Sequence, residues 1–423
     1  MTNELKDRIS KIRSGEVPEG YKKTKMGILP NDWNIVKLKD IAQHITKKNS
    51  EMKYTETLTN SAALGIINQT DYFEKQISNN NNIDGYYVVE EGDYAYNPRI
   101  SVSAPCGPIS KSHISETGIM SPLYTVFRFS DIDDSYYESY FKSSFWYRYM
   151  NSVANYGARF DRMNITNDDF FSMPLPSPPL PEQQKIAEIL STQDKVIALI
   201  QKQIEELKKL KKAYLQKMFP QKCSLFPEIR FKGFTDAWEQ RKLGEVFTEY
   251  SEKNHEELSP LTIIQGKGTI LREESNRNLI YDKAGLKNYK LVNEGDFILH
   301  LRSFEGGLEM ANSRGIVSPA YHIFHGENAD SRFYYPFFRS KYFISVLLKP
   351  HVYGIRDGKS IDVEGMKLIR IPCPKIEEQQ LIGDYFETLD TLITLHQRKL
   401  EQEQQKKKAL MQLLLTGIVR VKV

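Results

Sequence analysis

The residues of this sequence best suited to ligand chemistry are arginines in polar loops. Arg159 and Arg356 follow a glycine at the same spacing, in Gly157-Ala-Arg159 and Gly354-Ile-Arg356. Glycine lets a backbone approach a ligand closely, and arginine can bridge O6 and N7 of guanine or grip a phosphate. We therefore predict nucleic-acid contact, with internal salt bridges as the alternative, for Arg99, Arg159, Arg162, Arg302, Arg356 and Lys359.

Patterns that would form an active site are absent or incomplete. Gly354–Ser360 resembles a phosphate-binding loop, but three residues separate its glycines and the motif requires four. Ser177–Leu180 is similar to the catalytic tetrapeptide of amino-methyltransferases, yet it lacks the aromatic residue that would stack on a flipped base. His322 and His325 lie on an expected strand, where this spacing directs them to opposite faces. We expect neither a catalytic residue nor a metal site in this chain.

The composition indicates a globular protein. At roughly 100–200 residues per domain, the 423 residues predict about two to four domains. Apolar residues make up 40% and charged residues 26%, which excludes a disordered or membrane-spanning chain. Three distant cysteines predict neither disulfides nor a zinc site. With no secretory signal at the N-terminus, we expect a cytoplasmic protein, and the net charge of +4 says little about partners.

The chain repeats itself once. Residues 181–219 align with residues 377–415 at a constant shift of 196 and without a gap, so that Glu182 falls on Glu378. Between these segments the shift drifts, and the Glu-Gly-Asp triplets that end at Asp93 and Asp296 differ by 203. Insertions and deletions are therefore confined to the regions between the aligned segments. This contrast predicts two variable heads on a frame of fixed length.

The aligned segments predict two long helices. Their apolar residues recur mostly at steps of three, four or seven, a coiled-coil-like stripe, and 39 residues correspond to about 57 Å of helix. Because neither stripe can be buried alone, we expect the helices to pack antiparallel with pseudo-two-fold symmetry. Seven lysines in these helices are expected to form a solvated face, with phosphate or partner contact as the alternative: Lys208, Lys209, Lys211, Lys212, Lys406, Lys407 and Lys408.

Each head is expected to have a mixed α+β fold with a curled sheet. Short β-like runs dominate the heads, and helical stretches follow near 135–151 and 332–348. Each Glu-Gly-Asp triplet predicts a turn into a strand that leads toward Arg99 or Arg302. The expected segments are an N-terminal segment (1–29), a first head (30–176), a proline linker with the central helix (177–229), a second head (230–372) and a C-terminal helix (373–423).

The order of the motifs carries a family resemblance. Gly27-Ile-Leu-Pro-Asn-Asp-Trp33 and Phe231-Lys-Gly-Phe-Thr-Asp-Ala-Trp238 open the two heads, Glu-Gln-Gln opens both long helices, and Leu414-Leu-Thr-Gly417 follows the second helix. Together, over essentially the whole chain, they resemble the DNA-specificity subunit of type I restriction–modification systems. One departure is that Pro181 aligns with Glu377, which affects only the start of the helix.

The resemblance implies a DNA reader that is not itself an enzyme. Each head would recognise one half of a split site in double-stranded DNA, and the helices would set the unread spacer and dock two methyltransferase subunits. S-adenosylmethionine, ATP and magnesium would belong to those subunits and to a motor–nuclease subunit, with no cofactor in this chain. Residues 1–29 would complete the family's circular arrangement. Two alternatives remain, a methyltransferase or endonuclease with its own active site and a coiled-coil scaffold whose heads bind protein.

Overall fold

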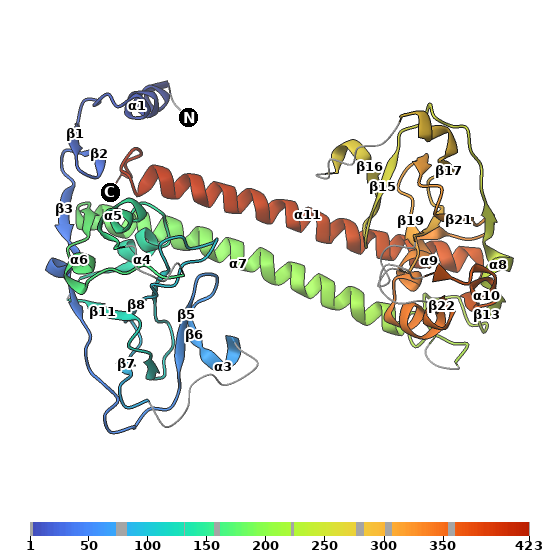
Figure 1. The fold of residues 1–423 in the computed structure, drawn as a ribbon, viewed down its shortest axis with the longest axis horizontal. Coiled ribbons are helices and arrows are strands. Elements are labelled where there is room, and N and C mark those ends of the chain that lie inside the picture. Colours follow the sequence, from blue (N-terminus) through green and yellow to red (C-terminus); the bar gives the residue numbers. More distant parts are fainter. Residues whose placement is uncertain are drawn as a thin grey trace. The chain divides into compact units, whose positions relative to one another are not determined.

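The chain divides into two compact units. Unit 1 contains Met1–Leu199 and Leu400–Val423, and unit 2 contains Ile200–Lys399. The long helices α7 (Leu180–Lys217) and α11 (Ile376–Leu414) each contribute one part to each unit (Figure 1). The computed structural model describes residues 3–72, 83–130, 132–155, 161–220, 224–275, 283–300, 307–353 and 360–422.

Unit 1 contains a mixed α+β globular part. Its helices are α1 (Asn3–Ser14), α2 (Leu38–Ile41), α3 (Gln69–Tyr72), α4 (Ser135–Phe141), α5 (Tyr147–Val153) and α6 (Asn167–Phe171). Its strands are β1 (Tyr21–Thr24), β2 (Gly27–Pro30), β3 (Asn34–Lys37), β4 (Ala42–His44), β5 (Leu58–Ser61), β6 (Gly65–Asn68), β7 (Tyr87–Val89), β8 (Tyr94–Tyr96), β9 (Ile109–Lys111), β10 (Gly118–Met120), β11 (Thr125–Phe129) and β12 (Pro174–Ser177).

Unit 2 follows nearly the same order of elements. Its helices and helical turns are α8 (Leu243–Val246), η1 (Arg272–Glu274), η2 (Lys283–Asn288), α9 (Ser331–Phe338), η3 (Phe343–Leu348), η4 (Lys349–His351) and α10 (Val363–Lys367). Its strands are β13 (Glu239–Lys242), β14 (Thr248–Tyr250), β15 (Leu261–Ile264), β16 (Gly268–Leu271), β17 (Lys290–Val292), β18 (Phe297–Leu299), β19 (Glu309–Met310), β20 (Gly315–Val317), β21 (His322–His325), β22 (Val352–Tyr353), β23 (Ser360–Ile361) and β24 (Arg370–Cys373).

The sheets of the two units correspond strand by strand. The four-stranded sheet of unit 1 has the order β4-β11-β8-β9, and that of unit 2 has the order β14-β21-β18-β19. All of these pairs are antiparallel, and their registers match, because Phe127 pairs with Tyr94 as Phe324 pairs with Phe297. The repeat seen in the sequence is therefore a repeat of topology, and the mixed α+β fold expected for each head is confirmed.

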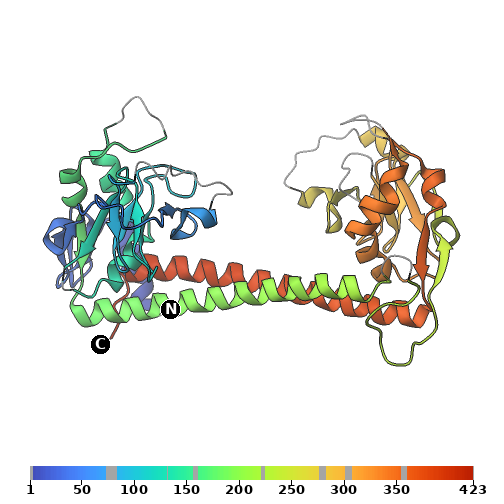
Figure 2. The ribbon, with the colours of Figure 1, turned by 90° about the horizontal axis from the view of Figure 1, so that it is seen from below.

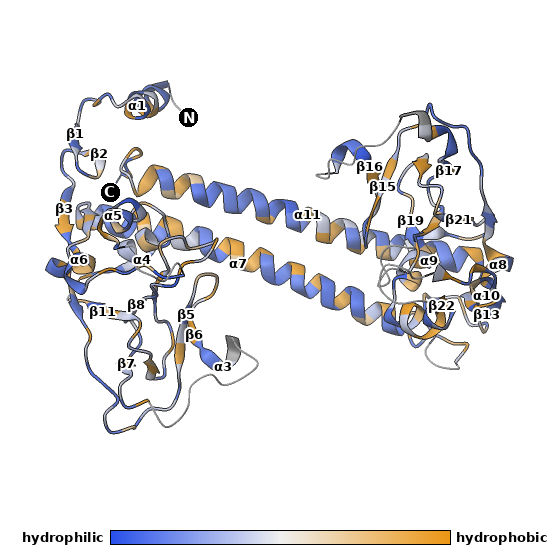
Figure 3. Ribbon diagram, in the orientation of Figure 1, coloured by the Kyte–Doolittle hydropathy of each residue, from blue (hydrophilic) through white to orange (hydrophobic). Residues whose placement is uncertain are grey.

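The helix segments run antiparallel within each unit. In unit 1 the amide of Gln193 on α7 donates to Glu403 Oε2 on α11 at 2.6 Å. The apolar stripe is largely buried, with Ile186, Leu190 and Ile204 at most 6% exposed. Orange and blue stretches alternate along both helices in Figure 3, as an amphipathic pattern requires. The helices begin and end within one or two residues of the segments aligned in the sequence.

The core of each unit continues from the globular part into the helices. In unit 1, Trp33 and the aromatic residues of α4 pack in one cluster with Ile186 and Leu414. In unit 2, Trp238 packs in one cluster with Ile382 and Phe386. Figure 2 shows the helix segments along one side of each globular part. Each head is thus held to its helix segments by apolar burial, which disfavours independent motion of head and helix. None of the described helices is long and apolar enough to cross a membrane.

Candidate nucleic-acid interface

Two of the predicted arginines lie side by side in unit 1. Arg99, just beyond β8, and Arg162 form an isolated antiparallel bridge, so separate stretches of the sequence bring their backbones together. Asp161 Oδ2 lies 3.7 Å from the guanidinium groups of both Arg99 and Arg162. These contacts are longer than a hydrogen bond. The Arg99 and Asp161 side chains are 65% and 55% exposed, and such an exposed ion pair contributes little free energy. The arginine pair can therefore exchange this one carboxylate for phosphate at low cost.

The arginine pair lines a cleft of unit 1. The cleft has a volume of about 600 Å³ and lies between the β5–β6 hairpin, the loop after β8 and the loop before β11. Most of the lining surface is apolar, and Thr57, Thr59 and Ser61 add hydroxyl groups to it. A concave surface with hydroxyl groups and two cations suits a polar, anionic ligand. Among the described residues, the internal-salt-bridge alternative provides one carboxylate, that of Asp161, for the two arginines.

The other four predicted residues lie outside the described residues. They are Arg159, Arg302, Arg356 and Lys359. The ends of the two Gly-x-Arg loops are nevertheless placed: Asn155 bridges Asn164 in unit 1, and Val352 pairs with Ile361 in unit 2, at a shift of 197 for both members. The loops therefore begin and end at equivalent points of the two folds. The incomplete phosphate loop at Gly354–Ser360 also lies mostly outside the described residues.

The Glu-Gly-Asp turns hold the strands that lead to these loops. Asp93 accepts a hydrogen bond from the Glu90 N–H at 2.8 Å, and Arg128 Nε donates to its other oxygen at 2.6 Å. In unit 2, Asp296 accepts from the Asn293 N–H at 2.7 Å. Both aspartate side chains are fully buried. A buried carboxylate requires such donors, so these turns have a structural role.

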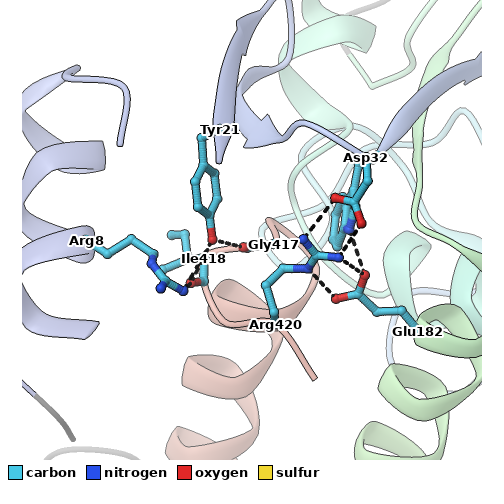
Figure 4. A network of polar contacts seen from close by, with 8 residues as sticks. Arg8, Tyr21, Asp32, Glu182, Gly417, Ile418 and Arg420 are labelled. Atoms are coloured by element: carbon cyan, nitrogen blue, oxygen red, sulfur yellow. Dashed lines mark hydrogen bonds and ion pairs between the residues drawn. The ribbon is translucent and has the colours of Figure 1, made fainter. Parts of the chain in front are cut away.

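A buried glutamate at the start of each long helix joins head and helix. Trp33 Nε1 donates to Glu182 Oε2 at 2.9 Å, and Arg420 Nε donates to Glu182 Oε1 at 2.8 Å. Figure 4 shows Arg420 also reaching Asp32, with which it forms two hydrogen bonds of 2.9 and 2.6 Å. These bonds hold the pKa of Asp32 below its usual value. Beside them, Tyr21 donates to the Gly417 carbonyl at 2.8 Å, which ties the N-terminal segment to the C-terminal segment.

Unit 2 repeats this arrangement with residues from one continuous part of the chain. Trp238 Nε1 donates to Glu378 Oε2 at 3.0 Å, and Arg230 donates to both Glu378 oxygens at 2.8 Å. Arg230 and Arg420 thus perform the same task, and we name these two sites the helix-start clamps. Neither arginine was predicted from the sequence as a functional residue. A match of Ile229-Arg230-Phe231-Lys232 with Val419-Arg420-Val421-Lys422 is the signal that would have found them.

Two of the lysines expected on a solvated helix face form ion pairs with the facing helix. Lys407 contacts Asp194 in unit 1, and Lys211 lies 2.5 Å from Asp390 in unit 2. Both members of one pair map onto the other at the shift of 196 residues. The expectation of a solvated face was wrong for these two lysines, because antiparallel packing places an aspartate of the facing helix beside each of them.

The residues considered for chemistry have structural partners. His322 Nδ1 lies 2.7 Å from Glu249, and His325 Nδ1 lies 2.7 Å from Asp296, so the two histidines contact different carboxylates. Burial raises the pKa of the Cys106 thiol, which disfavours the nucleophilic thiolate. Within the described ranges, three or more potential metal-ligating side chains do not gather at any point.

Comparison with known proteins places this arrangement in a family. The family model for the type I restriction modification DNA specificity domain matches residues 30–209 and 235–404. The chain belongs to this family. A putative type I restriction enzyme MjaX specificity subunit from Methanocaldococcus jannaschii is 26% identical and aligns over 96% of this chain and 97% of its own length. The MjaVIII specificity subunit of the same organism is 33% identical over 60% of this chain and 64% of its own length.

Solved structures share the fold. A chain from a study of complex assembly and conformational transition of the type I restriction–modification system aligns with 92% of this chain and 99% of its own length, at 15% identity and a TM-score of 0.54. The S subunit of a type I system from M. genitalium aligns with 90% of this chain and 96% of its own length, at 14% identity and a TM-score of 0.54. The two matches to the family model correspond to the two repeats of this specificity subunit.

Proposed function

We propose that this specificity subunit has no active site and selects the DNA on which partner subunits act. Each unit would read one half of a two-part site in double-stranded DNA, and the helices would set the unread spacer. The observation that carries this proposal is that the units share strand order and helix-start clamps but differ in their loops. The two units therefore share one framework and would present two different sets of DNA-contacting residues. Arg99 and Arg162 would contact phosphate, while neighbouring loops read base edges.

The helices offer equivalent docking positions for two methyltransferase subunits. Val196 and Leu199 are 36% and 57% exposed, and Leu392 and Leu395, at the shift of 196 residues, are 37% and 51% exposed. Exposed apolar residues repeated at matching positions favour two copies of one partner. S-adenosylmethionine would bind to those subunits, and ATP and magnesium would serve a motor–nuclease subunit. This assembly would work in the cytoplasm.

The DNA-contact proposal is tested with Arg99→Ala and Arg162→Ala in the full chain, assembled with its methyltransferase subunits. DNA affinity would be measured over a range of salt concentrations. Each variant is expected to bind more weakly and to reduce the salt slope by about one, as loss of a phosphate contact does. Arg148→Ala, an exposed arginine of α5, is the matched control. Unchanged affinity and slope in both variants would refute the assignment.

The spacer role has a separate test. Inserting about four residues, roughly one helical turn, into 195–210 is expected to change the spacer length of the methylated site, and an unchanged spacer would contradict it. The enzyme alternative instead requires the purified chain alone to bind S-adenosylmethionine or cut DNA. The scaffold alternative requires that exchange of a head with a relative leaves the choice of DNA site unchanged.

A further inference from the structure

Each unit contains a β-hairpin at the same place in its fold. In β5–β6, Ser61 pairs with Gly65 across a three-residue loop, and in β15–β16, Ile264 pairs with Gly268 across a loop of the same length. Gly65 and Gly268 have φ of +71° and +75°, a conformation that strongly favours glycine and that closes three-residue hairpins. The two hairpins therefore share their geometry at the residue that follows the tip. They can be compared position by position at a shift of 203.

The tips of these hairpins differ in chemistry. The tip of β5–β6 is Ala62-Ala63-Leu64, and the tip of β15–β16 is Gln265-Gly266-Lys267. All six residues are exposed, and Leu64 is 64% exposed. At the shift of 203 residues, Leu64 corresponds to Lys267. One tip thus presents apolar groups, and the other presents hydrogen-bond donors.

Both hairpins are fixed to the fold by buried polar groups. In unit 2, Glu309 accepts from the Gly266 and Gly268 N–H groups at 2.9 and 3.3 Å, and Asn312 Nδ2 donates to the Lys267 carbonyl at 2.7 Å. Glu309 is itself paired with Arg339 at 2.6 Å. Because these hydrogen bonds are made to the backbone of the tip, they fix the directions in which the tip side chains leave the hairpin. Such preorganisation favours recognition, because little order must be gained on binding.

In unit 1 the hairpin is bonded to the strand that leads to the arginine pair. Asn60 Nδ2 donates to the carbonyls of Ala95 and Pro108 at 2.7 and 3.1 Å, and Asn97 Nδ2 donates to the Asn60 carbonyl at 2.9 Å. Asn97 Oδ1 in turn accepts from the Arg99 N–H at 3.0 Å. The hairpin and Arg99 therefore belong to one connected polar network. A ligand held by the arginine pair lies next to this hairpin.

The cleft beside this hairpin contains acceptors that lack donors. Asn60 is 2% exposed, and both Asn60 and Gln69 line the cleft. In the part of the chain that the structure describes, Asn60 Oδ1 and Gln69 Oε1 have no hydrogen-bond partner. The two bonds made by Asn60 Nδ2 fix the orientation of the amide, so its oxygen remains an acceptor. Buried acceptors without donors are unfavourable, and both oxygens are buried within the wall of the cleft, so a ligand in the cleft does not reach them.

An A·T base pair has a group that an exposed apolar tip can contact. In the major groove it presents the thymine methyl and the adenine N6 amino group, whereas a G·C pair presents the guanine acceptors N7 and O6, to which lysine donates. The major groove also admits a two-stranded ribbon. An apolar tip suits the thymine methyl of an A·T pair, and a tip carrying a lysine suits the guanine acceptors of a G·C pair.

We propose that the β5–β6 hairpin enters the major groove at an A·T pair, with Leu64 against the thymine methyl, and that the β15–β16 hairpin reads a guanine through Lys267. This assignment rests on the proposed function, because it names the elements with which each unit reads its half-site. The two half-sites would differ because the equivalent position carries Leu64 in the hairpin of unit 1 and Lys267 in the hairpin of unit 2.

Reciprocal exchange of the equivalent residues tests the assignment. Leu64→Lys and Lys267→Leu would each be placed in the full chain and expressed with the methyltransferase subunits, and methylated bases would be mapped across the genome. Leu64→Lys is expected to lower methylation at sites with the A·T pair by roughly 5- to 100-fold and to favour G·C there, in one half-site only. Lys267→Leu is expected to relax a G·C position in the other half-site only.

Controls keep the outcomes distinct. Ile35→Lys and Lys242→Leu change exposed residues of β3 and β13 and are expected to leave the site unchanged. Leu64→Ala removes only the apolar contact and is expected to relax the same position as Leu64→Lys. If the wild-type chain directs methylation to a two-part site and the hairpin variants alter neither half, the hairpin assignment is overturned. If the wild-type chain does not determine a two-part site, the proposed function itself fails.

Discussion

Units 1 and 2 have the same fold, but equivalent contacts in the two units are made by residues from different parts of the chain. The clamp of unit 2 uses Arg230, close in sequence to Trp238, whereas the clamp of unit 1 uses Arg420 from the opposite end of the chain. The buried aspartates also have different partners, since Asp93 pairs with Arg128 and Asp296 pairs with His325 at the equivalent position of the sheet. In both units, hydrogen-bond donors therefore surround the buried carboxylates, but the donor residues and their positions in the chain differ between the units.

The largest expected difference concerns the helix-start clamps. Arg230 is 13% exposed and Glu378 is 1% exposed, whereas Arg420 is 35% exposed. Arg230→Ala is expected to cost about 3–5 kcal/mol, because it leaves a buried carboxylate without its cation. Arg420→Ala is expected to cost less, since water reaches that site more easily. Urea unfolding of both variants, with exposed Arg241→Ala as the control, measures the difference, and equal losses would contradict it.

A smaller effect is expected at the buried aspartates. Arg128→Ala leaves fully buried Asp93 without the cation that now donates to it, whereas after His325→Ala, Asp296 keeps the bond from the Tyr250 hydroxyl at 2.5 Å. We expect Arg128→Ala to lower the free energy of unfolding by about 1–3 kcal/mol and His325→Ala to lower it by less. Thermal unfolding of both variants beside Arg148→Ala measures this order. A larger loss of stability in His325→Ala than in Arg128→Ala would contradict this order.

The smallest expected effect is a pH dependence at the clamp of unit 1. Hydrogen bonds from Arg420 lower the pKa of Asp32 below its ordinary value. Its contribution is therefore complete above the unfolded value of about 4 and is lost as the pH falls through the lower folded value. Asp32→Asn is expected to destabilise the protein slightly at neutral pH, with the difference from wild type vanishing at low pH. A difference that grows toward low pH would reverse the assigned sign.

The sequence predicted the parts of the fold that depend on periodicity and on repetition. The long helices and the Glu-Gly-Asp turns could be predicted because a stripe and a turn are local patterns. The contact of Arg99 with Arg162 was not predictable, since it depends on which loops the sheet brings together. The ion pairs of Lys407 and Lys211 depend in the same way on the register of the facing helix.

The base-reading elements were not predictable for a different reason. Ala62-Ala63-Leu64 and Gln265-Gly266-Lys267 have no similarity to each other, so they are not recognisable as a repeat in the sequence. Only the pairing of the flanking strands places Leu64 and Lys267 at one equivalent point. If the half-sites differ, the residues that recognise them must differ between the heads. An internal repeat of the sequence therefore identifies the shared fold but not the residues that contact DNA. The DNA contacts proposed for Arg159, Arg302, Arg356 and Lys359 remain predictions.

The most direct test gives both units the same head. In a chain whose residues 235–374 are replaced by a copy of residues 30–178, the shared proline and tryptophan positions preserve both clamps. Methylated bases would be mapped across the genome in cells that also express the methyltransferase subunits. If each head reads one half-site, the methylated site should become two copies of the first half-site. Retention of the original second half-site would contradict the account.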